Sequence, residues 1–138
     1  MNDIILLKQG ELILKGQNRR FFEQRLVSNI KRRLAPIGEF RVYAMQSTVY
    51  VEPKNDSADM DAAFDAMLRV FGVVAVSRAR GCEKDKDAIT RTAIEYLADA
   101  MRSAASFKVE SKRADKSFPM TSIQLSQYVG GELADAFP

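Results

Sequence analysis

The feature of this sequence that most restricts its fold is the order of strand and helix signals in the first half of the chain. The apolar run 4–7 predicts a strand that is central in a sheet or covered on both faces. A helix is predicted next, over about 19–34, because apolar residues recur there at i, i+4 spacing. The residues that share this face are Phe22, Leu26, Val27, Ile30 and Leu34. Pro36 and Gly38 predict the end of this helix.

Two strands, a second helix and a fourth strand are predicted to follow. Segments 40–44 and 48–51 are rich in β-branched and aromatic residues on either side of a short turn, which predicts a β-hairpin. The second helix is expected to begin with Asp59 or Asp61 as its cap and to end at a glycine. Its expected inner face holds Phe64, Met67, Leu68 and Phe71. Segment 73–77 then predicts the fourth strand.

The predicted order is therefore strand, helix, strand, strand, helix, strand. This order is typical of the split βαβ, or ferredoxin-like, arrangement, in which two helices cover one face of a four-stranded antiparallel sheet. We accordingly expect an α+β fold whose first domain covers residues 1–79. The scaffold alone indicates no function, because many activities use it.

The pattern restarts in the second half of the chain, and we expect a second domain over 80–138. A helix is predicted over 85–104, a strand over 106–113 and a last helix that begins with a capping box at Thr121. The glycine pair 130–131 inside that helix suggests close packing or an approaching backbone. One strand and two helices cannot form a sheet core alone. We therefore expect an incomplete domain with exposed apolar surface, met by a partner chain, a domain swap or disorder, in a fragment of a longer protein.

Composition and charge restrict the classes of function. The net charge is only +3, but positive charge is concentrated in 1–34 while 52–66 is acidic. Such a polarised chain suggests a polyanionic partner, with ordinary surface patterning as the alternative. The absence of histidine removes the commonest general base and most zinc sites, so we expect no metal site, and a self-contained enzyme is disfavoured, although a carboxylate-based one stays open.

The single cysteine and the lack of long apolar runs indicate the compartment. Cys82 has no partner for an internal disulfide, which fits a reducing cytoplasm, and we expect it to be a buried small residue. No apolar run approaches the ~20 residues of a membrane span, so we expect no membrane association.

Two stretches combine cations with the start of a helix. The connection 10–22 between the first strand and helix contains two glycines and the polar or cationic residues Lys15, Gln17, Asn18, Arg19 and Arg20. A loop that opens a helix offers free N–H groups and the positive end of the helix dipole, which suits a phosphate. A solvated connection is the alternative interpretation.

The second stretch is 107–119, ahead of the last helix. Lys112, Arg113 and Lys116 lie at the expected strand end and in the loop, so cations and free amides again face one place. The alternative is a charged strand edge that discourages aggregation.

These two stretches also carry a family resemblance. Residues 10–22, GELILKGQNRRFF, resemble the N-terminal signature of the tRNA 4-thiouridine synthetases, also called tRNA uracil 4-sulfurtransferases. Residues 107–119, followed by the sequence VGGE at 129–132, resemble the THUMP domain of the same family. The two motifs occur in the family's order and together cover essentially the whole chain.

The resemblance implies an architecture and an activity for the parent protein. Family members have an N-terminal ferredoxin-like domain, then a THUMP domain, then an ATP-binding PP-loop domain. The first two domains bind tRNA, chiefly through the acceptor stem and the 3′ end. The PP-loop domain adenylates the target uridine with ATP and Mg²⁺, and sulfur arrives from a cysteine desulfurase as a persulfide. Many members also serve thiamine biosynthesis, and the enzyme is commonly a homodimer.

For this chain, the resemblance implies a non-catalytic, tRNA-binding N-terminal part of such an enzyme, without a cofactor of its own. It departs from the family pattern by stopping inside the THUMP domain, so the later THUMP strands and the PP-loop domain are absent. The residues expected to hold RNA phosphates are Lys15, Asn18, Arg19 and Arg20 in the first unit and Lys112, Arg113 and Lys116 in the second. The alternative is a ferredoxin-like regulatory or protein-interaction module that does not bind RNA.

Overall fold

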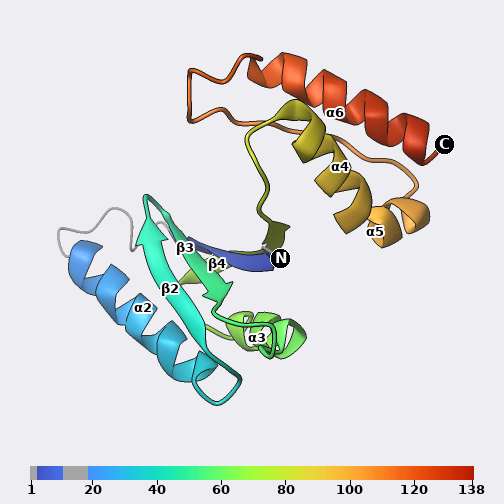
Figure 1. The fold of residues 1–138 in the computed structure, drawn as a ribbon. Coiled ribbons are helices and arrows are strands. Elements are labelled where there is room, and N and C mark those ends of the chain that lie inside the picture. Colours follow the sequence, from blue (N-terminus) through green and yellow to red (C-terminus); the bar gives the residue numbers. More distant parts are fainter. Residues whose placement is uncertain (1–2, 11–18) are drawn as a thin grey trace. The chain divides into compact units, whose positions relative to one another are not determined.

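The structure is a computed structural model that describes residues 3–10 and 19–138. The chain divides into two compact units, Met1–Gly81 (unit 1) and Cys82–Pro138 (unit 2). Figure 1 shows the strands gathered in unit 1 and only helices and irregular segments in unit 2. Each unit is described by itself.

Unit 1 contains a four-stranded sheet in which every neighbouring pair is antiparallel. Its strands are β1 (Asp3–Gln9), β2 (Phe40–Met45), β3 (Thr48–Pro53) and β4 (Val73–Arg80). The order across the sheet is β2-β3-β1-β4, so the first apolar strand occupies a central position, as its sequence predicts. The element order and this sheet confirm the predicted ferredoxin-like, α+β arrangement.

Helices α2 (Arg19–Leu34) and α3 (Met60–Met67) supply the other half of the unit 1 core. The strand residues that alternate toward them are fully buried, such as Ile5 and Leu7 in β1. They form one cluster with Leu26, Ile30 and Leu34 of α2 and with Ala63 and Met67 of α3. Asp59 caps α3 by accepting a hydrogen bond from the Ala62 N–H at 3.0 Å, which decides between the two expected caps.

The end of α3 differs from the sequence prediction. The helix stops at Met67, and the expected inner residues Leu68 and Phe71 are 57% and 98% exposed. Val70 turns inward instead and is 7% exposed. The chain leaves the helical path before it reaches Phe71, and Gly72 then takes a left-handed φ of 92° that favours glycine. Phe71, seven residues after Phe64, is therefore not on the inner face of a helix as the sequence predicted.

Unit 2 is built from α4 (Lys86–Tyr96), α5 (Ala98–Ser103) and α6 (Ser122–Ala136). The helix expected over 85–104 is thus interrupted at Leu97, which ends α4 and precedes α5. Its start is as expected for a capped helix, because Asp85 accepts from the Ala88 N–H at 3.0 Å. The capping box of α6, between Thr121 and Gln124, is confirmed.

The strand expected over 106–113 does not form. A strand needs a neighbour to complete its ladder of hydrogen bonds, and the described residues of unit 2 contain no other strand. The segment instead lies against α6, where a Cβ added to Gly130 would be 3.7 Å from Val109 Cγ2. That is ordinary contact, and a Cβ on Gly131 would meet nothing, so the close packing expected of this glycine pair is absent.

Exposure in unit 2 gives two further outcomes. Leu97, Phe107 and Ile123 are 37%, 42% and 71% exposed, in line with the expected exposed apolar surface. Cys82 is also exposed, so the expectation of a buried cysteine is wrong. It lies in the irregular connection between β4 and α4, where no described element covers it. Across the described residues, no helix combines the length and apolar character that crossing a membrane requires.

Candidate nucleic-acid interface

The carboxyl end of β1 is the place where several parts of unit 1 meet. The backbone N–H of Gln9 donates to the Ser47 carbonyl at the tip of the β2–β3 hairpin, at 3.2 Å. The Gln9 side chain donates from Nε2 to Glu23 of α2 at 2.9 Å. The next N–H, of Gly10, donates to the Gly72 carbonyl just before β4, at 2.9 Å. The hairpin tip, the start of α2 and the start of β4 therefore share one end of the sheet, called here the signature end.

Arg19 and Arg20 are the first two residues of α2, and both are exposed at this signature end. Arg19 Nη2 donates to the Gln46 carbonyl of the hairpin tip at 3.3 Å, which fixes the direction of its side chain. The first turn of α2 contains no acidic residue, so the helix dipole and both guanidinium groups add to one positive potential. The other two predicted residues of this group, Lys15 and Asn18, lie outside the described residues.

In the second predicted group, Arg113 has a structural role, whereas Lys112 and Lys116 are exposed. Arg113 Nη1 donates to the carbonyls of Phe118 and Met120, both at 3.3 Å, so it closes the loop before α6. Lys112 and Lys116 are exposed. Arg113 therefore shapes the loop that presents the two lysines, rather than offering its own charge freely.

A carboxylate belongs to the same loop. Asp115 accepts from the N–H and the hydroxyl of Ser117, at 3.0 and 2.6 Å, and from Lys84 Nζ at 3.4 Å. The Ser117 hydrogen bonds, aided by Lys84, hold the pKa of Asp115 below its ordinary value. The carboxylate stays charged, and it fixes the loop while offsetting part of the local positive charge.

Two adjoining hollows open beside this loop, of about 280 and 300 Å³. Both are lined by Lys84 and Phe118, and the lining changes from cationic to apolar within each. The remaining lining residues are Ile89, Lys112, Arg113, Ala114, Asp115 and Leu125 in the first, and Asp85, Lys86, Pro119, Met120 and Tyr128 in the second. A hollow lined by both apolar and cationic side chains can take a nucleotide, whose base has apolar faces and whose phosphate is anionic.

Lys84 and Lys86 were not among the phosphate-binding residues predicted from the sequence. The sequence does contain a signal for them, because they flank Asp85, the residue that caps α4. Because cations close to a helix N-terminus favour phosphate, the same rule that selected Arg19 selects them.

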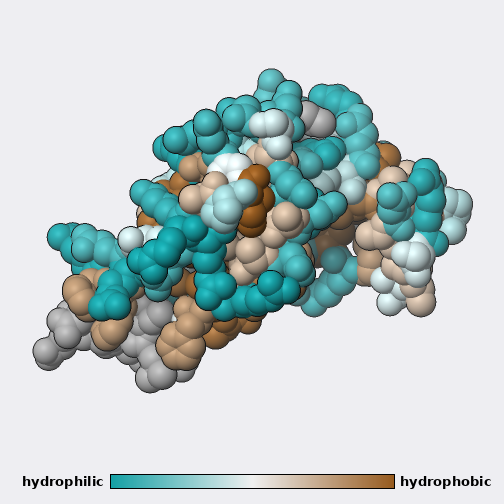
Figure 2. All heavy atoms as spheres, turned by 90° about the horizontal axis from the view of Figure 1, so that it is seen from below, coloured by the Kyte–Doolittle hydropathy of each residue, from teal (hydrophilic) through white to brown (hydrophobic). Residues whose placement is uncertain are grey.

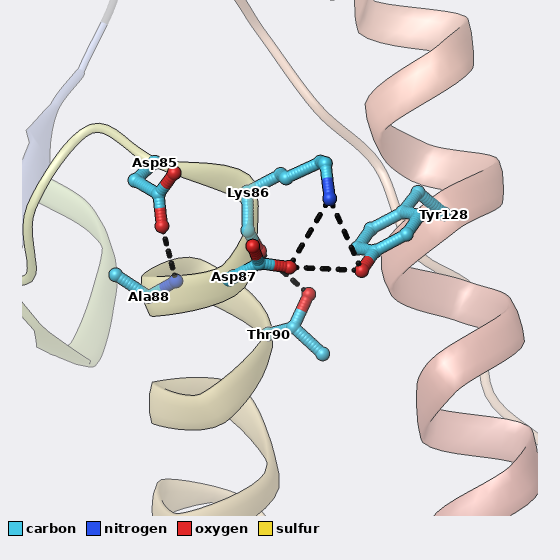
Figure 3. A network of polar contacts seen from close by, with 6 residues as sticks. All are labelled: Asp85, Lys86, Asp87, Ala88, Thr90 and Tyr128. Carbon is cyan, nitrogen blue, oxygen red and sulfur yellow. Dashed lines mark hydrogen bonds and ion pairs between the residues drawn. The ribbon is translucent and has the colours of Figure 1, made fainter.

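Lys86 is held in a network that links α4 to α6 (Figure 3). The Tyr128 hydroxyl donates to Asp87 Oδ1 at 2.9 Å, and Lys86 Nζ lies 3.2 Å from that carboxylate oxygen. The same Nζ lies 3.4 Å from the Tyr128 hydroxyl and 4.5 Å from the ring centroid. The hydrogen bond from Tyr128 and then Lys86 lower the pKa of Asp87, while Asp87 and then Tyr128 raise the pKa of Lys86. The ammonium therefore stays charged and oriented.

The signature end of unit 1 and the loop region of unit 2 both present oriented cations that can bind anions. Residues 3–10 and 19–138 include no group of three or more His, Cys, Asp or Glu side chains that could hold a metal ion. Exposed cations lie near the start of a helix in both units, at α2 in unit 1 and at α4 and α6 in unit 2. This arrangement suits a ligand that carries many phosphates.

Comparisons with known proteins agree with this division and with the resemblance. Residues 4–77 match the ThiI ferredoxin-like domain family, and residues 83–138 match the THUMP domain family. The curated relatives include a probable tRNA sulfurtransferase of Alkaliphilus oremlandii, 38% identical over 98% of this chain and 35% of its own length. One from Acetivibrio thermocellus is 36% identical over 100% of this chain and 36% of its own length. The chain thus spans about a third of the length of these relatives.

Solved structures share the fold. The crystal structure of PH1313 from Pyrococcus horikoshii has a TM-score of 0.78 and 23% identity, over 98% of this chain and 45% of that one. The crystal structure of a 4-thiouridine synthetase–RNA complex with bound ATP has a TM-score of 0.79 and 20% identity, over 99% of this chain and 34% of that one. These structures confirm the fold. The matches over 4–77 and 83–138 confirm the resemblance: this chain belongs to the ThiI ferredoxin-like domain family and continues into a THUMP domain.

Proposed function

We propose that this chain is the tRNA-binding N-terminal part of an ATP-dependent tRNA uracil 4-sulfurtransferase, divided into a domain over 1–79 and a THUMP portion over 80–138. The observation that carries the proposal is the pairing of the two family matches, in this order, with relatives named probable tRNA sulfurtransferase. Exposed cations at element ends support it in each unit.

The proposed contacts are to the RNA backbone. Arg19 and Arg20 hold phosphates at the signature end of unit 1, together with Lys15 and Asn18. In unit 2, phosphates contact residues around the loop before α6: Lys84, Lys112 and Lys116, with Arg113 shaping the loop. RNA helices are recognised largely through shape, phosphates and 2′-hydroxyls, for which cations on firmly held element ends are suited.

The chemistry of the parent enzyme is proposed to reside beyond this chain. ATP with Mg²⁺ would act in a PP-loop domain, and a cysteine desulfurase would supply the sulfur as a persulfide. A homodimer, a cytoplasmic location and a second role in thiamine thiazole synthesis complete the proposal. The supporting observation for ATP and RNA is the structural relative, which is a 4-thiouridine synthetase–RNA complex with bound ATP.

The test is the salt dependence of tRNA binding by the whole 138-residue chain. We expect Arg19→Ala and Lys116→Ala each to weaken binding and to reduce the slope of log affinity against log salt by about 0.7–0.9, the share of one phosphate contact. Arg41→Ala is the matched control, because Arg41 is 68% exposed but is paired with Glu52 and lies on β2 away from the hairpin tip.

Two results would contradict the proposal. Unchanged affinity and slope in both variants would remove the assigned contacts. Equally weak binding of tRNA and of double-stranded DNA by the wild-type chain would favour a regulatory or protein-interaction module instead.

A further inference from the structure

The signature end of unit 1 collects apolar side chains that its own core does not use. Nine large apolar residues are exposed in the described part of the chain, and six of them are in unit 1. The six are Phe21, Phe22, Met45, Leu68, Phe71 and Val74. All six belong to segments that end or begin at the signature end: the start of α2, the hairpin tip, the end of α3 and the start of β4.

Phe71 is the most exposed of them, at 98%. Packing does not explain this residue, because Val70 beside it fills the core and Gly72 after it makes the turn. A phenylalanine left in water forgoes a large gain from burial. Its position between an inward valine and a turning glycine nevertheless holds the ring outward at the entry to β4.

Phe22 projects from the signature end for a different reason. It lies on the buried line of α2, four residues before Leu26 and eight before Ile30, which are 4% and 0% exposed. Phe22 itself is 45% exposed, so the rest of unit 1 covers this side chain only in part. Its ring meets Phe21 edge to face, with centroids 5.8 Å apart, and the Arg25 guanidinium lies 5.7 Å from the Phe21 centroid.

Charge decides which class of ligand fits these rings. The exposed cations Arg19, Arg20 and Arg25 belong to the first two turns of α2, beside Phe21 and Phe22, and Lys8 is exposed near the end of β1. Of the nearby acids, Glu23 is bonded to Gln9 and Asp65 is paired with Arg69. The buried centre of a protein–protein interface is depleted of charge, whereas single-stranded nucleic acid is bound by cations interleaved with aromatic rings. Figure 2 shows hydrophilic residues beside apolar ones over the face in view.

We infer that the signature end of unit 1 is a stacking site for unpaired nucleobases, with Phe71 at one side and Phe21 and Phe22 at the other. The inference rests on the proposed function and deepens it: unit 1 contacts unpaired nucleotides as well as phosphates. Four strands about 4.8 Å apart make this end roughly 15 Å wide, which is room for a short run of nucleotides. Aromatic rings stack on any base, so the site is tolerant of sequence.

Phe71 provides the experiment, because its exposure makes it replaceable without loss of fold. The whole chain is titrated with tRNA, with an eight-nucleotide oligoadenylate and with a blunt-ended RNA hairpin. Phe71→Ala is expected to weaken oligoadenylate binding about 5- to 150-fold, the range that loss of one stacked base produces, and to leave the blunt hairpin unchanged. Leu68→Ala is the matched control, since Leu68 is exposed at the same end but has no ring.

A second variant reports stacking directly. The chain contains no tryptophan, so Phe71→Trp introduces a single indole fluorophore. We expect this variant to keep the wild-type affinity and its fluorescence to be quenched in step with oligoadenylate binding. Phe107→Trp, at an exposed position of unit 2, serves as the control for quenching away from the signature end.

The outcomes separate this inference from the proposed function. If the wild-type chain binds tRNA but Phe71→Ala binds oligoadenylate normally, or the Phe71→Trp signal does not change, the stacking site is wrong and the proposed function stands. If the wild-type chain does not bind tRNA, both fail. If Phe71→Ala abolishes self-association in sedimentation equilibrium while RNA affinity is unchanged, the rings contact protein, which overturns the inference.

Discussion

The two units differ in how much apolar side chain each buries. Eleven buried residues of unit 1 form one cluster between its sheet and helices. Of the fourteen buried apolar residues in the described chain, that leaves three for unit 2, namely Ala88, Val129 and Leu133. A four-stranded sheet with two helices thus closes a core of its own, whereas three helices and an extended segment do not. We expect unit 2 to open locally at a lower free energy than unit 1.

The same difference appears in how each unit holds its cations. Arg19 and Arg20 project from a 16-residue helix that is packed on the sheet. Lys112 and Lys116 lie on a loop that is held by side-chain bonds of Arg113 and Asp115. Unit 1 therefore holds these cations on a firmly packed element, whereas the positions of the unit 2 cations depend on a few polar bonds near the protein surface.

The strongest test of this contrast removes one core side chain from each unit. Ile30→Ala, at a fully buried position among sheet and helix residues, should cost about 2–5 kcal/mol of unfolding free energy. Leu133→Ala in α6 should cost less than Ile30→Ala, because fewer buried neighbours surround it. Amide hydrogen exchange followed by mass spectrometry measures both, since it assigns protection to each unit separately. Equal losses of unfolding free energy in the two variants would contradict the expected difference between the cores of unit 1 and unit 2.

Local signals were sufficient to predict most of unit 1 from the sequence. The bounds of α2 follow from apolar spacing and from Pro36 and Gly38, and the hairpin follows from residue types on either side of a turn. Caps were also predictable, since Asp59 and Thr121 act through bonds within three residues. The order of these elements predicted a ferredoxin-like domain, and the family match over 4–77 confirms it.

The misses are places where tertiary contacts decide. Helical spacing put Phe71 inward, but the chain turns before it and Val70 takes the core position. Alternation of side chains over 106–113 resembled a strand, but no described neighbour completes its ladder. At the candidate site, sequence selected Lys112 and Lys116, yet could not show that Arg113 is occupied by backbone carbonyls or that Lys84 lies beside them.

A smaller effect is expected from removing a helix cap in each unit. Thr121→Ala deletes the capping box of α6, and Asp59→Ala deletes the cap of α3, so each should cost about 0.5–2 kcal/mol. If unit 2 opens more readily, the loss at Thr121 should raise hydrogen exchange along all of α6. The loss at Asp59 should affect only the first turn of α3. Similar local effects in both helices would show that unit 2 is as cooperative as unit 1.

The pH dependence of unit 1 should come partly from Asp3, which joins β1 to β4. Arg80 Nε donates to Asp3 Oδ1 at 2.5 Å, and this bond holds the pKa of Asp3 below its ordinary value. Because the folded pKa is depressed, the stabilisation is present above the ordinary Asp pKa of about 3.9 and is lost as pH falls through the folded value. The pair is partly exposed, so we expect about 0.5–1 kcal/mol.

Acid unfolding of Asp3→Asn measures this contribution. The variant should be less stable than wild type near pH 7, and the difference should vanish at the lowest pH. Asp65→Asn is the control, since Asp65 is paired with Arg69 at 3.4 Å on the exposed surface. If the difference in unfolding free energy between Asp3→Asn and wild type stayed constant across the acid range, the Asp3–Arg80 ion pair would make no pH-dependent contribution to stability.

The smallest effect should come from Tyr128→Phe, which tests whether α4 and α6 are in contact at all in solution. The Tyr128 hydroxyl is the largest cause of the lowered pKa of Asp87, so its removal should raise that pKa toward the ordinary value, with Lys86 keeping part of the shift. Carbon-13 NMR titration of the carboxylates measures it, and Asp115 serves as the internal reference because Ser117 and Lys84 hold its pKa low independently. An Asp87 that already titrates normally in the wild-type chain would mean that the helix pair is open. The few buried residues of unit 2 would then be too few to hold the unit together.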